Sequence, residues 1–178
     1  MGISRIPPGA KLIVGILAKD LAILGKAEEL LNKEFGEIGY KSALLQFNFT
    51  DYYKEEMGNP LLKRFLCFKK LVSLENMPKI KIKTNDIEKK LALDKDGLLK
   101  RQVNIDPGYI TDSKLVLLTT KDFSHRIYLN KGIYAEITLA WKKNSFVPME
   151  WTYPDYRSKE YIDILNLMRE MYMKDREA

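Results

Sequence analysis

The segment TTKDFSHRIYL, residues 119–129, gathers the side chains of this sequence that are best suited to bind an anion or to move a proton. It holds His125, the one histidine of the chain, and histidine is the side chain that ordinarily titrates near neutral pH. Lys121 and Arg126 flank this histidine and are suited to charge-assisted hydrogen bonds with a phosphate. We therefore expect His125 to be the acid–base group of any catalytic site, and Lys121 and Arg126 to be anion contacts.

His125 also has an ordinary structural interpretation. A lone histidine at the edge of a sheet commonly bonds a carboxylate and takes no part in chemistry, and the sequence alone favours this interpretation. If residues 125–129 form a strand, alternation places His125 on one face with Ile127 and Leu129, and places Arg126 on the opposite face. We therefore expect that His125 and Arg126 do not contact the same ligand atom.

Two aspartates are candidates to orient the imidazole. Asp106 lies in NIDPGY, residues 104–109, where we expect a strand to end and the following Pro-Gly pair to turn. Such a position would present the carboxylate at the edge of the sheet, where sites are common. The alternative is that Asp106 bonds its own turn. Asp155 lies in WTYPDYRS, residues 151–158, which is also interpretable as a latch whose aromatic rings pin the last helix.

Further cations and aromatic rings complete the candidate site. Lys114 and Arg157 are expected anion contacts, and Tyr156 is an expected ligand-binding ring. QFNFTDYY, residues 46–53, offers a second aromatic surface, and rings exposed on a sheet can stack on the bases of single-stranded RNA. An RNA-binding surface would use Phe47, Phe49, Tyr52 and Tyr53. The segment lacks the Lys/Arg-Gly-aromatic pattern of an RNA-recognition module, which favours ordinary packing of these rings.

Length and charge limit the class of protein. The chain has 178 residues, of which 46% are hydrophobic, so one core can bury most of its apolar surface. We expect a single domain over residues 1–178. Thirty basic residues against 24 acidic ones leave a net charge of +6. This charge favours an anionic partner but falls short of the basic excess of a dedicated nucleic-acid binder.

The composition argues against several mechanisms. One cysteine, Cys67, cannot form an internal disulfide, and one cysteine with one histidine cannot build a common zinc site. We therefore expect no metal, and the residues identify no cofactor. The glycines of a P-loop or of a dinucleotide-binding loop are missing, since Gly15 is followed by Leu17, Ala18 and Lys19. The N-terminal residues do not resemble a signal peptide and no apolar stretch is long enough to span a membrane, so we expect a cytoplasmic protein without membrane contacts.

Periodicity and turn residues predict an α+β fold, with a ferredoxin-like βαββαβ half extended by C-terminal antiparallel strands and closed by a C-terminal helix. The expected elements of the first half are a strand at 11–18, a helix from Asp20 to Gly36, strands at 40–50 and 61–72, a helix at 78–92 and a strand at 101–106. The expected later elements are a hairpin that joins 125–129 to 133–141 through Asn130-Lys131-Gly132, and a helix at 159–174. The choice between helix and strand is open for 113–121 and, although a helix is favoured, for 78–92.

Four blocks of the sequence carry a family resemblance: VGILAKD, FNFTDYYKEEMG, NIDPGYITDSKLVLLTTKDFSHRIYL with GIYAEITL, and WTYPDYRS. Through them the chain resembles, over nearly its whole length, a bacterial family known as domain of unknown function 4416. This family has no established activity, cofactor or catalytic residue to carry over. Some relatives bear the label GTP-binding, which would imply guanine and phosphate contacts. Here the P-loop is missing, and Asn130-Lys131 is followed by Gly132-Ile133 in place of the aspartate that would bind guanine.

From these observations we expect a small cytoplasmic protein that binds a phosphate-bearing ligand or a nucleotide. Its site would be a basic, polar cleft built from residues 104–131 and 153–157. Two alternatives come from other classes. One is an RNA-binding module, and the other is a non-catalytic assembly protein that forms a homodimer through its last helix, where Met168, Met171 and Tyr172 make an apolar stripe. Whether the protein is an enzyme is left open by the sequence.

Overall fold

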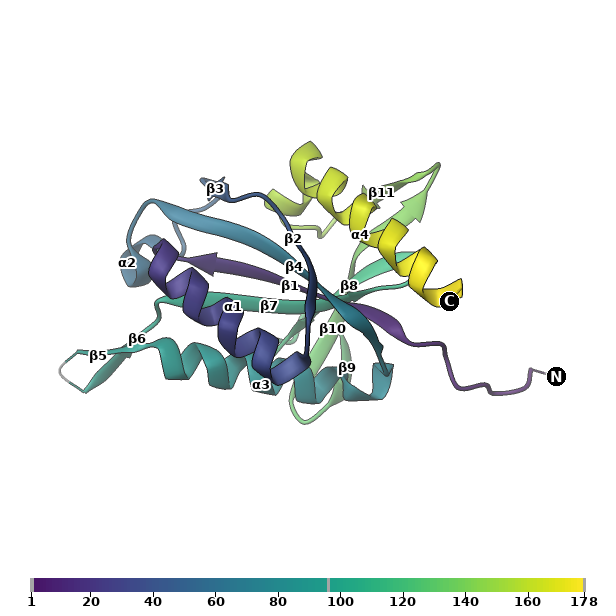
Figure 1. Cartoon of the computed structure of the whole chain (residues 1–178), viewed down its shortest axis with the longest axis horizontal. Helices are drawn as coiled ribbons and strands as arrows, with labels where there is room; N and C mark the ends of the chain where they lie inside the picture. The colour runs from purple at the N-terminus through teal and green to yellow at the C-terminus, as the bar shows by residue number, and fades with distance from the viewer. Residues whose placement is uncertain (1, 96, 178) are drawn as a thin grey trace.

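The computed structural model describes residues 2–95 and 97–177, and shows a mixed α+β protein with a large antiparallel sheet (Figure 1). The helices are α1 (Leu21–Phe35), α2 (Lys54–Met57), α3 (Met77–Leu91) and α4 (Lys159–Glu177), with 3₁₀ turns η1 (Leu74–Asn76) and η2 (Asp155–Arg157). The strands are β1 (Ala10–Ala18), β2 (Ile38–Lys41), β3 (Leu45–Phe47), β4 (Leu61–Val72), β5 (Leu93–Lys95), β6 (Leu98–Lys100), β7 (Val103–Ile110), β8 (Lys114–Thr119), β9 (Ile127–Asn130), β10 (Ile133–Lys142) and β11 (Ser145–Pro148).

The main sheet has the strand order β11-β10-β8-β7-β1-β4-β2. Strand β3 also pairs with β4, β9 also pairs with β10, and the small hairpin β5-β6 stands apart. All of the pairings within the sheet are antiparallel. Strand β1 therefore lies in the middle of the molecule, between β7 and β4, and its nine residues are all buried.

Alternation along β1 divides the core into two layers. Leu12, Val14 and Ile16 point to the face that α1 and α3 cover, whereas Ile13 points to the face that α4 covers. Figure 1 shows α1 and α3 side by side on one face and α4 on the other. A strand that is buried on both faces needs an unbroken apolar run, which is the pattern that predicted β1. Gly15 interrupts this run on the α4 face, and the interruption is important for the site.

Local signals correctly predicted the first helix, α1, and the hairpin β9-β10. Asp20 caps α1, because its Oδ1 accepts a hydrogen bond from the amide of Ile23 at 2.8 Å. Gly36 ends α1 with φ +92°, a backbone angle that favours glycine. The hairpin β9-β10 is confirmed, and its turn holds Lys131 at φ 53° and Gly132 at φ 75°.

Two predicted boundaries were wrong. Residues 40–50 form two strands, β2 and β3, because Ser42 leaves the ladder and its Oγ accepts a hydrogen bond from the amide of Phe65. Strand β9 begins at Ile127, so His125 and the next residue belong to the turn before it. The alternation argument therefore does not apply to His125. The open segment 113–121 contains strand β8, and the favoured helix at 78–92 is confirmed as α3.

The predicted turn after Asp106 was also wrong. Strand β7 continues through Pro107 and Gly108 to Ile110, and Asp106 lies inside the strand, opposite Gly15 of β1. Gly108 permits this path because it lets β8 approach closely, since a Cβ atom there would lie 2.4 Å from the carbonyl oxygen of Val116. The Pro-Gly pair thus serves strand packing, and the carboxylate of Asp106 lies within the sheet.

The final helix packs its apolar stripe against its own sheet. Leu165, Met168 and Tyr172 are buried in the core between α4 and the sheet. The stripe that suggested a dimer contact is thus covered within the chain, and dimer formation stays a prediction. In the part of the chain that the structure describes, no helix combines the length and the apolar character that crossing a membrane requires.

Candidate functional site

A cleft with a volume of about 750 Å³ opens where β7 and β8 separate. Strand β8 pairs with β7 only at Gly108, Tyr109 and Ile110, so the first half of β7 has no strand partner on that side. Pro107 is the first residue beyond this pairing, and proline has no amide hydrogen to continue a ladder. Sheet residues form the floor of the cleft, and α3, residues 47–53, 117–121 and 153–156 form its walls.

Two side chains of α3 bind the backbone that β8 leaves unpaired. The amide of Ile105 donates to Oε1 of Glu88 at 2.5 Å, and Nζ of Lys81 donates to the carbonyl oxygen of Ile105 at 3.0 Å. Buried backbone groups need such partners, so these side chains hold the sheet open without leaving Ile105 unsatisfied. The same contacts place a cation and a carboxyl group at the inner wall of the cleft.

The floor of the cleft contains a buried lysine without a partner. Lys63 of β4 is 2% exposed, and no hydrogen bond or ion pair joins its ammonium to any residue that the structure describes. Its Nζ lies 5.4 Å from the ring centre of Phe65 and 5.6 Å from that of Tyr156. Burying an unpaired charge is costly, and aromatic faces compensate only in part. The arrangement is suited to an anionic group that enters the cleft.

Gly15 makes the space in which this ammonium lies. A Cβ atom on Gly15 would lie 3.2 Å from Nζ of Lys63 and 3.2 Å from the hydroxyl oxygen of Tyr156. Both side chains therefore reach over the one position of β1 that has no side chain on this face. The Tyr156 hydroxyl is buried and has no hydrogen-bond partner among the described residues. Tyr156 lines the cleft beside Lys63.

Three carboxyl groups besides that of Glu136 line the same cleft. Oδ2 of Asp106 accepts from Nδ2 of Asn104 at 2.7 Å, and Oδ1 lies 4.0 Å from Nζ of Lys81. Burial raises the pKa of Asp155, and the positive charge of Lys63 offsets part of that rise. Burial also raises the pKa of Glu88, to about 7, while Lys81 and the Ile105 amide act in the opposite direction. A carboxyl group with this pKa can hold or release a proton near neutral pH.

An aromatic wall closes the outer side of the cleft. It consists of Phe47, Phe49, Tyr52 and Tyr53. The rings of Tyr52 and Tyr53 are perpendicular, with centres 4.9 Å apart. Nζ of Lys121 lies 5.3 Å from the ring centre of Tyr52 and 3.5 Å from its hydroxyl oxygen, so this pair spans the mouth of the cleft.

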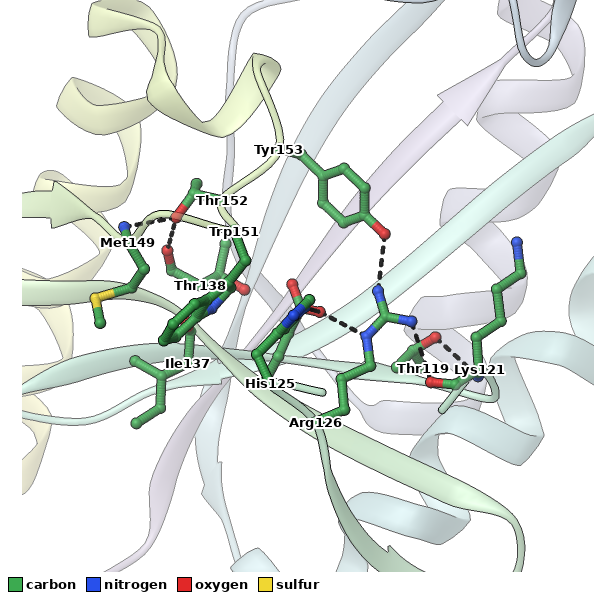
Figure 2. A network of polar contacts seen from close by, with 11 residues as sticks. Thr119, Lys121, His125, Arg126, Ile137, Thr138, Met149, Trp151, Thr152 and Tyr153 are labelled. Atoms are coloured by element: carbon green, nitrogen blue, oxygen red, sulfur yellow. Dashed lines mark hydrogen bonds and ion pairs between the residues drawn. The ribbon is translucent and has the colours of Figure 1, made fainter. Parts of the chain in front are cut away.

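Arg126 lines the cleft, but its guanidinium is already bonded within the protein. Nε donates to Oε2 of Glu136 at 2.8 Å, Nη1 donates to the carbonyl oxygen of Lys121 at 3.1 Å, and Nη2 donates to the hydroxyl oxygen of Tyr153 at 2.9 Å. Figure 2 shows the guanidinium between Tyr153 and Lys121. Arg126 therefore braces the wall of the cleft and leaves little capacity for a ligand.

His125 lies on the far side of Glu136 from the cleft. Its Nε2 is 3.1 Å from Oε2 of Glu136, the same oxygen that Arg126 binds, and its ring stacks on Trp151 with centres 5.2 Å apart. The alternation argument does not apply to His125 and Arg126, because both residues precede strand β9. That they do not contact the same ligand atom stays a prediction. The carboxylate partner of the imidazole is Glu136, and neither of the two aspartates predicted from the sequence bonds to it.

The segment 149–157 is anchored as a latch on β10. The hydroxyl of Thr152 donates to the carbonyl oxygen of Thr138 at 2.6 Å, as Figure 2 shows. Arg157 donates from Nε to the carbonyl oxygen of Thr152 and from Nη2 to that of Glu150, both at 2.7 Å. Arg157 thus stabilises the latch and does not line the cleft. Lys114 also lies outside the cleft, at the end of β8 farthest from it.

The structure thus brings five of the eight predicted site residues to one cleft: Asp106, Lys121, Arg126, Asp155 and Tyr156. Sequence reasoning missed Lys63, Lys81 and Glu88. A signal for Lys63 was present, because Leu61, Phe65 and Cys67 share its face of β4 and are all apolar. A lysine among such neighbours is expected to be buried. Nothing local marks Glu88, whose role depends on the gap beside Ile105.

Comparison with known families covers most of the chain. Residues 8–172 match a family described as a domain of unknown function, number 4416. The chain belongs to this family. A search of curated proteins found no match, and a search of solved structures found none.

The region that defines domain 4416 includes the whole cleft. The match runs from before β1 to the last turns of α4, so it contains Gly15, Lys63 and Asp155. The residues that line the cleft therefore all lie within the matched region.

Proposed function

We propose that this protein binds a phosphate-bearing small molecule in the cleft between β7 and β8, and that a nucleotide is the leading class of ligand. One observation carries the proposal, namely the buried ammonium of Lys63, which forms no ion pair or hydrogen bond with any residue that the structure describes. A phosphate oxygen would supply the missing charge and accept charge-assisted hydrogen bonds. The 2% exposure of Lys63 means that only the end of a molecule can reach it.

The other walls support a ligand that carries a ring as well as a phosphate. Lys121 at the mouth has no carboxylate partner among the described residues and offers a second positive charge. Phe49 and Tyr52 are 41% and 61% exposed, so they offer rings at the entrance. Stacking of a base on such rings is a common mode of nucleotide binding. A volume of about 750 Å³ is in the range of small-molecule sites.

The depth of Lys63 favours a small molecule over RNA. An internal phosphodiester lies between two nucleosides and would not fit at the end of a cleft, whereas a terminal phosphate would. Phe47, one of the four rings expected to bind RNA, is 6% exposed and packs against Phe49 and Tyr53. Its surface is therefore occupied by the protein.

We also propose a ferredoxin-like description for residues 10–110. The order β7-β1-β4-β2, with α1 and α3 on one face, supports it, because these elements follow one another in the chain as βαββαβ. In this description β8, β10 and β11 extend the sheet beyond β7, and the ligand cleft lies at the junction between the ferredoxin-like half and its extension.

Thermal unfolding with added ligands tests the proposed function. Inorganic phosphate, nucleoside 5′-monophosphates and short single-stranded RNA with a 5′-hydroxyl would each be added to the parent and to Lys63→Met. We expect the phosphomonoesters to raise the Tm of the parent and to leave that of Lys63→Met unchanged, because a ligand stabilises only the state that binds it. Lys70→Met is the matched control, since Lys70 is an exposed lysine of the same strand. Equal stabilisation of all three proteins would contradict the proposal.

A further inference from the structure

The floor of the cleft presents a carboxylate beside the unpaired ammonium. Asp106 of β7 and Lys63 of β4 lie on the two strands that flank β1, and both side chains are on the α4 face of the sheet. Asp106 pairs with Gly15, and the ammonium of Lys63 also lies over Gly15. No side chain of β1 stands between them at this position.

These two charged groups do not neutralise each other. No ion pair joins Lys63 to Asp106, so the ammonium and the carboxylate are more than 4.0 Å apart across the described cleft. Nζ of Lys63 lies 3.2 Å from the position of a Cβ atom on Gly15, and Asp106 is the cross-strand neighbour of Gly15, so one ligand can contact both groups. Asp106 is 34% exposed at its side chain, so its carboxylate is accessible from the cleft.

A carboxylate next to a bound phosphate is unfavourable unless it accepts a hydrogen bond from another group of the same ligand. A site for a simple anion would be weakened by Asp106, Asp155 and Glu88, because like charges repel a bound phosphate. A carboxylate becomes favourable when the same ligand carries a hydrogen-bond donor, and it accepts strongly from a hydroxyl group. Ribose hydroxyls are held in this way by acidic residues in dinucleotide-binding proteins.

Asp106 is held ready to accept such a hydrogen bond. Asn104 bonds its Oδ2, and the side-chain oxygen of Asn104 accepts in turn from Nη1 of Arg101 at 3.0 Å. Arg101 is fixed by an ion pair with Glu56 at 3.3 Å. Oδ1 has no hydrogen-bond donor among the residues described, since Lys81 lies 4.0 Å from it. The network thus fixes the orientation of the carboxylate and leaves one oxygen for a ligand.

We infer that the cleft selects a phosphate ester whose organic part bears hydroxyl groups, as in a ribonucleotide or a sugar phosphate, with Lys63 binding the phosphate and Asp106 accepting from a hydroxyl. This inference rests on the proposed function, because it assigns the phosphate to Lys63. It adds a requirement on the rest of the ligand. The ligand must reach from Lys63 to Asp106 across the Gly15 position, which the ribose of a 5′-nucleotide or the chain of a sugar phosphate can satisfy.

Matched ligand pairs test the inference. Binding of ribonucleoside 5′-monophosphates would be measured by calorimetry against their 2′,3′-dideoxy counterparts, and binding of ribose 5-phosphate against n-pentyl phosphate. Within each pair the phosphate is the same; the nucleotides differ only in their hydroxyls, and the second pair compares a sugar with an alkyl chain of the same number of carbon atoms. We expect at least one hydroxyl-bearing compound to bind about tenfold or more tightly than its partner, as for a hydrogen bond to a charged group. Equal binding within both pairs would overturn the inference.

Two variants assign the preference to Asp106. Asp106→Asn removes the charge, keeps the shape and leaves an oxygen that accepts from Asn104, so we expect it to fold and to reduce the preference to about threefold or less. Asp122→Asn is the matched control, because Asp122 is exposed between β8 and β9 and does not line the cleft. Retention of the full preference by Asp106→Asn would overturn the assignment. Circular dichroism and thermal unfolding of both variants show whether the fold is kept.

The outcomes separate this inference from the proposed function. If inorganic phosphate protects the parent through Lys63 while the two members of each pair bind equally, the proposed function stands and the hydroxyl requirement falls. If no phosphate compound binds the parent, both fall. If Asp106→Asn loses the preference but still binds inorganic phosphate, both stand. Asp106 would then be the residue that distinguishes phosphate esters with hydroxyl groups from phosphate esters without them.

Discussion

Lys81 and Glu88 lie two turns apart on α3 and bind the carbonyl oxygen and the amide of the same residue, Ile105. They take the place of the strand that is missing beside β7. The contact places Glu88 where burial raises its pKa to about 7, so the proton of this carboxyl group is linked to the stability of the fold.

The first prediction concerns this linkage. A carboxyl whose pKa is higher in the folded protein than in the unfolded chain binds more protons when folded, so stability falls as pH rises from about 4.5 to about 7. Glu88→Gln removes this dependence and keeps an oxygen for the Ile105 amide. We expect the stability of the variant relative to the parent to rise by about 2 kcal/mol between pH 5 and pH 8. Urea unfolding at both pH values measures it.

Glu29→Gln is the control for this experiment, because Glu29 is exposed on α1. Its stability relative to the parent should be nearly the same at pH 5 and pH 8. A Glu88→Gln curve that ran parallel to that of the parent would show that Glu88 does not titrate in this range.

A second prediction is that removing Lys63 stabilises the protein without ligand. A buried ammonium without a partner destabilises the fold, and a methionine of similar length would pack against Phe65 and Tyr156. We expect Lys63→Met to raise the free energy of unfolding by about 1–2 kcal/mol in the absence of phosphate. Lys70→Met should change it by less than about 0.5 kcal/mol. A large loss of stability in Lys63→Met would indicate that Lys63 has a structural role.

The third prediction compares two glycines. Gly15→Ala places a Cβ atom 3.2 Å from Nζ of Lys63, so the ammonium must move by a few tenths of an ångström. We expect stabilisation by phosphate compounds to be weakened while the fold is kept. Gly25→Ala is the control, since Gly25 lies in α1 with nothing within 4 Å of an added Cβ, and alanine there should stabilise by about 0.5–1 kcal/mol. Unchanged phosphate binding in Gly15→Ala would indicate that Lys63 does not bind the phosphate.

A fourth prediction separates His125 from Glu136. His125→Gln keeps a hydrogen bond to Glu136 but cannot titrate near neutral pH, and we expect phosphate stabilisation and its pH dependence to match the parent. Glu136→Gln leaves the guanidinium of Arg126 without its charged partner in a buried position. We expect it to lower stability by about 2–3 kcal/mol. If His125→Gln changed the pH dependence of stabilisation by phosphate, the result would show that the imidazole takes part in the site.

Local patterns predicted the elements whose formation depends on neighbouring residues. The cap at Asp20, the stop at Gly36 and the turn at Lys131-Gly132 are such cases, and each is confirmed. The strand through Pro107-Gly108 is the opposite case. A Pro-Gly pair ordinarily predicts a turn, but the close approach of β8 at Gly108 requires extended backbone there. No local pattern contains that information.

The sequence shows which groups are available for chemistry, and from it we predicted Asp106, Asp155 and Lys121, which all line the cleft. The tertiary structure decided which groups meet. Lys63 and Asp106 are 43 residues apart in the sequence. Their side chains come together because β1, which lies between their strands, has Gly15 and no side chain at the position that separates them. Glu88 faces them because β7 and β8 separate at Pro107. Strand order and the gap between strands arise from packing across the whole sheet, so the neighbouring residues of each segment could not predict them.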